Sequence, residues 1–235
     1  NWSYGIGETL TLLVPNVKGG GSGSTMSQSE AAMAKANPMY NGIYSQLPQY
    51  FGEQPWTAGP VYVGAFVMFL FVLGCFIVKG PLKWALLGAT IFSILLSWGK
   101  NFMGLTDFFI DYVPMYNKFR AVSSILVIAE FTIPLLAIFA LKEILSKPDM
   151  LKQEKNCRGV IAALVLTAGV ALILAVAPGT FFSSFITTQE MTALKQALPA
   201  EHLAPFVANL TEMREAIIAS DAWRSFFIIV IGCLF

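Results

Sequence analysis

The sequence has few charged residues. Only 12% of its 235 residues are charged, whereas 56% are hydrophobic, and soluble domains carry roughly 25% charged residues. The mean hydropathy is +0.65. The apolar residues form long uncharged blocks and not the short alternating runs of half-buried strands, a pattern typical of membrane-spanning helices. The sequence therefore predicts an all-α fold, a polytopic transmembrane helical bundle, with the lipid bilayer as a partner.

Cysteine, histidine and basic tracts are also scarce. Cys75, Cys157 and Cys233 lie in or beside apolar blocks without metal-like spacing, which argues against a disulfide framework. His202 is the only histidine, and one histidine makes no metal site. The net charge of +1 is not concentrated in a basic tract that could follow a phosphate backbone. We therefore expect neither a metal nor a nucleic-acid partner.

The two ends lack the features of a complete chain. No initiator methionine, signal peptide or basic leader precedes Asn1. The final uncharged block, SFFIIVIGCLF, is 11 residues long, about half of the ~20 residues that cross a bilayer. We expect the chain to be a fragment of a larger membrane protein, truncated at both ends.

The apolar blocks predict four complete spans and the start of a fifth. The spans are expected at about 60–78, 82–98, 120–141 and 159–180, with the fifth in 222–235. Polar regions separate them: an extracytoplasmic or interfacial loop region at 1–59, an interfacial helix near 101–113, and an extracytoplasmic helical segment at 187–221. In the last segment, Thr187 followed by Glu190 is a capping-box pattern.

The basic residues predict the orientation. The turn at 79–83 holds two lysines and the loop at 142–158 holds five basic residues. Short loops rich in Lys and Arg stay in the cytoplasm, so both are expected there, within the membrane region 60–186. Residues 1–59, 99–119 and 187–222 then face outward.

The third predicted span begins with two outward basic residues, Lys118 and Arg120. These side chains could extend to lipid headgroups, or they could bind an anionic group such as a lipid phosphate. Inside the same span, Glu130 precedes Pro134 by one turn. An intramembrane carboxylate marks a functional site or a hydrogen bond between helices.

Three further carboxylates are candidates. Asp107 and Asp111 are four residues apart on one face of the expected interfacial helix, where they could line a cavity, act as acid/base groups or form a solvated face. Glu8 lies among glycine and aromatic residues. It could line a cavity, cap a helix or be solvated.

Four segments together resemble the bacterial YfhO family of multi-spanning membrane proteins, in forms seen in Bacteroidetes. The closest motif is Asn117-Lys118-Phe119-Arg120 before a span. The resemblance covers most of residues 1–145, in WSYGIGETLTLLVPNVKGGGSGS (2–24), YFGEQPWTAGPVYVGA (50–65), LLSWGKNFMGLTDFFIDYVPMYNKFRAVS (95–123) and AEFTIPLLAIFALKEIL (129–145).

The resemblance implies a GT-C-like fold in the bacterial cytoplasmic (inner) membrane. It also implies transfer of a sugar from a polyprenyl-phosphate donor to a cell-envelope glycopolymer acceptor at the outer face. The catalytic carboxylate of such enzymes lies on the first outward loop, which we expect upstream of Asn1. Two alternatives remain: a transporter or flippase in which Glu130 couples ions, and a non-catalytic envelope-assembly protein.

Overall fold

The computed structural model describes residues 2–118 and 121–234, and within these ranges the regular structure is helical, as predicted. One isolated bridge joins Thr25 to Pro48. A 3₁₀-helix, η1 (Ile6–Leu12), comes first. The α-helices are α1 (Glu30–Met33), α2 (Asn41–Tyr44), α3 (Ala65–Ile77), α4 (Pro81–Ser97), α5 (Met103–Tyr112), α6 (Val127–Ser146), α7 (Glu154–Leu164), α8 (Val170–Val176), α9 (Thr188–Ala197) and α10 (Ala200–Gly232).

Two continuous helices are long and apolar enough to cross a membrane. Val122–Ser146 combines a 3₁₀ turn with α6 over 25 residues, and Glu154–Val176 joins α7 and α8 over 23 residues through a π-helical turn. A third span results if the pair Pro81–Ser97 and Gly99–Tyr112, bent by 107°, is counted as one. Among the described residues these two or three spans are fewer than the four complete spans predicted.

The predicted span at 60–78 is shorter as a helix, whereas α4, of 17 residues, is as long as the span predicted at 82–98. At 1.5 Å per residue, the 13 residues of α3 rise about 20 Å, less than the ~30 Å hydrocarbon core. Gly80 precedes Pro81, which disfavours helical geometry at Gly80 and separates α3 from α4. α4 ends before Gly99, whose positive φ of 45° allows the turn into α5.

The helix expected after Pro199 and the fifth span are one helix, α10, of 33 residues. Its buried face continues across the predicted boundary at about residue 222: Leu210 and Ile217 belong to one apolar core, and Ala222 and Ile229 to another. Because the helix is buried on one side along both cores, no break is needed between them.

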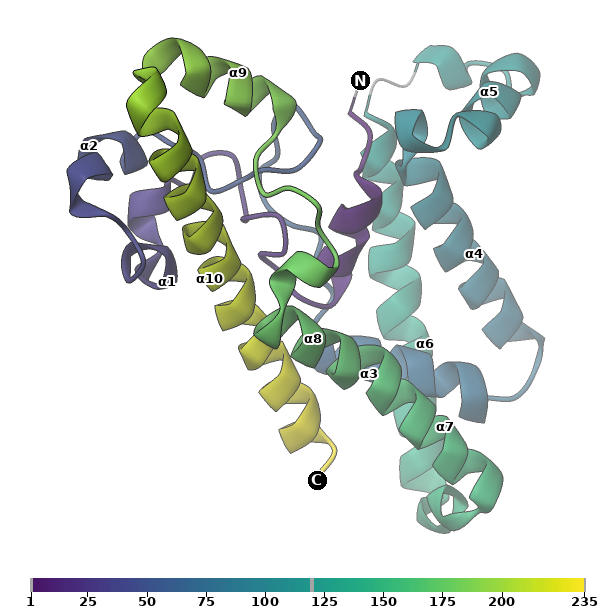
Figure 1. Ribbon diagram of the computed structural model, residues 1–235. Helices are drawn as coiled ribbons and strands as arrows, with labels where there is room; N and C mark the ends of the chain where they lie inside the picture. Colours follow the sequence, from purple (N-terminus) through teal and green to yellow (C-terminus); the bar gives the residue numbers. More distant parts are fainter. Residues whose placement is uncertain (1, 119–120, 235) are drawn as a thin grey trace.

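The second core defines a cap outside the apolar helices. It packs residues from segment 26–47 against α9 and the first half of α10, with Met26, Tyr44 and Phe206 fully buried. Figure 1 shows this cap, α5 and the N-terminal segment toward one end of the molecule, and the α3–α4 turn and α6–α7 connection toward the other. The loops therefore group as the charge pattern predicts.

Candidate functional site

Glu8, in η1, is a buried carboxylate with a full set of donors. Its side chain is 1% exposed. Oε2 accepts from the backbone N–H of Gly5 at 2.6 Å, and Oε1 accepts from the backbone N–H of Glu53 at 3.1 Å and from the Tyr50 hydroxyl. A buried charge requires such partners because the desolvated carboxylate would otherwise be too costly.

The backbone around Glu8 is anchored to the end of α4. Trp98 Nε1 donates to Thr9 Oγ1 at 2.9 Å, and Asn101 Nδ2 donates to the carbonyl oxygen of Tyr4 at 2.9 Å. The backbone N–H of Tyr4 donates to Ser97 O at 2.8 Å. These contacts place the carboxylate where the apolar helices meet the cap.

Lys18 lies beside the carboxylate, between two aromatic rings. Its Nζ is 4.2 Å from the ring centroid of Phe182 and 4.9 Å from that of Phe51, a favourable arrangement for a cation. Within residues 2–118 and 121–234, Nζ makes no hydrogen bond or ion pair. Burial lowers the pKa of Lys18, although the charges of Glu8 and Glu53 partly offset this. The ammonium therefore has N–H donors that a ligand could use.

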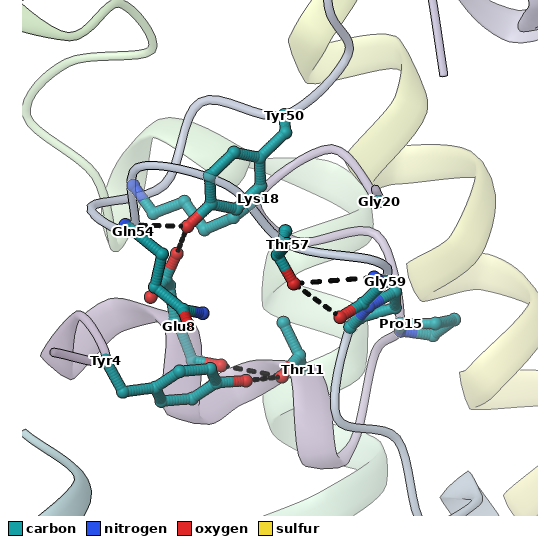
Figure 2. Close-up of a pocket in the computed structure, with 11 residues that line it drawn as sticks. Tyr4, Glu8, Thr11, Pro15, Lys18, Gly20, Tyr50, Gln54, Thr57 and Gly59 are labelled. Atoms are coloured by element: carbon teal, nitrogen blue, oxygen red, sulfur yellow. Dashed lines mark hydrogen bonds between the residues drawn. The ribbon is translucent and has the colours of Figure 1, made fainter. Parts of the chain in front are cut away.

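Two cavities share the wall formed by Glu8 and Lys18. The narrower cavity, which has room for about one water molecule, is drawn in Figure 2, where the Tyr50 hydroxyl points toward Glu8. The wider recess, of about 160 Å³, opens to solvent. Besides Glu8 and Lys18, the recess is lined by Gly5, Gly7, Glu53, Phe181, Phe182, Ser183 and Ser184.

Neutral hydroxyls line the narrower cavity. The Tyr4 hydroxyl and Thr11 Oγ1 are 2.5 Å apart, and Thr11 Oγ1 lies 2.7 Å from the carbonyl oxygen of Glu8. Tyr50 Oη accepts from the backbone N–H of Gln54 at 2.9 Å. Burial raises the pKa of both Tyr4 and Tyr50, and the charge of Glu8 raises each further, so both phenols remain protonated donors.

A glycine allows this close packing. A Cβ on Gly52 would overlap the Glu8 carboxylate and the Tyr50 hydroxyl. We expect Gly52→Ala to lower the free energy of unfolding by about 1–3 kcal/mol through overpacking, measured by denaturation in detergent. Gly42→Ala is the matched control because a Cβ on Gly42 meets nothing within 4 Å; equal stability of the two variants would contradict the packing described.

Arg214, on α10, is a buried cation next to the site. It is fully buried and forms two 2.7 Å hydrogen bonds to the carboxylate of Glu190. It also donates to the carbonyl oxygens of Phe185 at 2.6 Å and Pro48 at 3.3 Å. Its guanidinium lies 4.9 Å from the ring centroid of Phe51, the same ring that contacts Lys18.

Arg214 was not among the site residues predicted from the sequence. In a capping box, the Glu190 side chain would turn back to the start of its own helix. Thr187 does cap α9, accepting from the backbone N–H of Glu190 at 3.2 Å, but the Glu190 carboxylate binds Arg214. The one available signal was an arginine among the apolar residues of α10.

Of the predicted site residues, Glu8 lines the cavities. Lys118 is exposed at the end of a 3₁₀ turn, and Asp107 and Asp111 are exposed on α5. Glu130 is exposed in the first turn of α6, not enclosed between helices. Phe119, Arg120 and the side chain of Asn117 lie outside the part of the chain that the structure describes.

Comparison with known proteins adds no relative, and the described side chains offer no metal site. Within the described part of the chain, no three His, Cys, Asp or Glu residues come together in a group that could hold a metal ion. No family model, no curated protein and no solved structure matches this chain. The site's function therefore has to be inferred from its own geometry.

Proposed function

We propose that the chain is part of a multi-pass, GT-C-like glycosyltransferase of the bacterial cytoplasmic membrane. It moves a sugar from a polyprenyl-phosphate donor to a cell-envelope glycopolymer at the outer face. The proposal rests on Glu8 and Lys18, which line the wall shared by two cavities. This wall lies where the apolar helices meet the cap, a position that a lipid-linked donor can reach.

Sugar transfer from a polyprenyl-phosphate donor requires one base and one cation. An acceptor hydroxyl attacks the anomeric carbon, and its proton passes to the Glu8 carboxylate. The bond between that carbon and the phosphate oxygen breaks, and the electron pair leaves with the polyprenyl phosphate. Lys18 stabilises the charge that develops on the phosphate, with Lys118 and Arg120 as the further phosphate ligands. Glu8 is thus the proposed base, in place of the carboxylate that the resemblance to the YfhO family led us to expect upstream of Asn1.

The charge pattern supports a site at the outer face of the membrane. The site lies away from the basic connections at 79–83 and 142–158, which the positive-inside rule assigns to the cytoplasm. Figure 1 places these connections toward the opposite end from the N-terminal segment. The recess then faces outward, toward the cell envelope.

A transporter or flippase is the second candidate, and two observations favour it. The second spanning helix contains a π-helical turn at Val165–Gly169, and α4 and α5 form a pair bent by 107°; interrupted helices are common in transporters. However, the exposed Glu130 is not enclosed between helices where an ion would cross. Glycosyl transfer accounts better for the Glu8–Lys18 wall.

Lys18→Met is expected to change sugar transfer and protein stability in different ways. Loss of the cation is expected to reduce transfer by at least about 100-fold, as when one transition-state donor is removed. Stability at neutral pH should be equal or higher, because methionine keeps the aromatic contacts and removes a buried charge. Labelled-sugar transfer in vesicles and denaturation in detergent measure the two effects.

The pH dependence of stability has a definite sign. A lowered pKa means that the folded state binds the Lys18 proton less tightly than the unfolded chain, so wild-type stability rises between the lowered pKa and the ordinary value of 10.5. Lys18→Met lacks that rise. Lys35→Met, which removes an exposed lysine of the cap, is the control; unchanged transfer in Lys18→Met would exclude the proposed role.

A further inference from the structure

The lining of the wider recess is suited to hydroxyl groups. Two carboxylates converge beside Gly5: a Cβ on that residue would lie 3.2 Å from Glu53 Oε1 and 3.3 Å from Glu8 Oε2. The Glu53 side chain is 48% exposed and is therefore accessible from the opening. Ser183 is exposed and forms no hydrogen bond within the described ranges. The recess thus offers acceptors and a free hydroxyl to a ligand.

The charges of the recess select against anions. Glu8 and Glu53 contribute two negative charges, and Lys18 contributes one positive charge. Lys100 lies 3.8 Å from Glu53, but its side chain is 54% exposed and solvent screens it. An anionic ligand in the outer part of the recess would face both carboxylates, whereas uncharged hydroxyls could donate to them.

The carboxylates have capacity left for a ligand. Together, two ionised oxygens offer about four acceptor positions, and the protein fills three of those on Glu8. Phe181, 41% exposed at the recess, adds an apolar surface for the C–H face of a sugar ring.

From these features we infer that the wider recess is the acceptor subsite and binds a neutral saccharide chain that enters from the aqueous side. The inference rests on the proposed function and specifies the acceptor as an uncharged, hydroxyl-rich polymer. The phosphate of the donor is then held away from Glu53, on the Lys18 side of the wall.

Protection of an introduced cysteine tests this inference. Ser183→Cys is made in the full-length protein after its other cysteines, including Cys75, Cys157 and Cys233, are replaced. In membrane vesicles, alkylation by an impermeant maleimide is timed with tri-N-acetylchitotriose, with trigalacturonate or with inorganic phosphate. At ten times its dissociation constant, the neutral trisaccharide should slow labelling about tenfold by one-site occupancy. The two anions should leave the rate unchanged.

Matched variants serve as controls for the protection experiment. Ser45→Cys, exposed in the cap, should be labelled at the same rate with every probe. Glu53→Gln should raise the trisaccharide concentration needed for protection by about tenfold, because a charged acceptor is lost. Glu30→Gln, which replaces an exposed carboxylate of the cap, should leave that concentration unchanged.

Protection by either anion as strong as by the trisaccharide would overturn the inference, and so would failure of the trisaccharide to protect. The transfer assay is independent of this measurement. Sugar transfer without protection at Ser183→Cys rejects the acceptor subsite alone, whereas protection without transfer rejects the proposed enzyme activity.

Discussion

Replacing Arg214 by alanine is expected to lower the free energy of unfolding by about 3–5 kcal/mol, the loss typical of breaking a buried ion pair. The substitution leaves the carboxylate of Glu190 without its paired donor, and its side chain is only 14% exposed. It also leaves two carbonyl oxygens, those of Pro48 and Phe185, without the donor they have now. Chemical denaturation in detergent, monitored by tryptophan fluorescence, measures the loss.

Arg224 provides the matched control on the same helix. It forms a 3.2 Å ion pair with Asp221, but its side chain is 58% exposed. Exposed pairs contribute about 0–1 kcal/mol, so Arg224→Ala should change stability little. An Arg214→Ala loss no larger than that of Arg224→Ala would show that the Arg214–Glu190 pair does not hold the cap together.

Glu8→Gln is expected to reduce sugar transfer by at least about 100-fold, within the 10²–10⁴-fold range of general-base catalysis. The amide cannot accept a proton from the acceptor hydroxyl. Both carboxylate oxygens of Glu8 accept from N–H or O–H donors, so the amide nitrogen must also face one of them. That mismatch costs roughly 1–3 kcal/mol of stability, and transfer is therefore expressed per folded protein.

Tyr50→Phe distinguishes a catalytic role of Glu8 from a purely structural one. It removes one donor to Glu8 and preserves the carboxylate's charge. If Glu8 is the base, Tyr50→Phe should retain most of the transfer that Glu8→Gln loses. Equal losses in the two variants would instead show that Glu8 only connects η1 to the segment around residue 50.

Local patterns in the sequence predicted local structure well. The helical spacing of aromatic residues near 101–113 corresponds to α5, Met103–Tyr112. Thr187 caps α9 as its pattern indicated. In both cases the interactions that decide the structure lie within a few residues of each other, so the sequence contains them directly.

Interactions between distant segments could not be predicted in the same way. Glu8 was one of several candidate carboxylates until the fold brought Tyr50 and Glu53 to it from more than 40 positions away. Arg214 depends on Glu190 across 24 positions. The sequence also did not show that the helix after Pro199 continues without a break to Gly232, because the burial that continues along α10 comes from distant segments.

Sugar transfer at the outer face is tested with the full-length protein in sealed, oriented vesicles. A polyprenyl-phosphate donor carrying labelled sugar is placed in the membrane, and cell-envelope polymer is added on one side. We expect the polymer to become labelled only on the side of residues 1–59, with release of an equal amount of polyprenyl phosphate. Movement of intact donor across the membrane without labelled polymer on either side would contradict this expectation and identify a flippase.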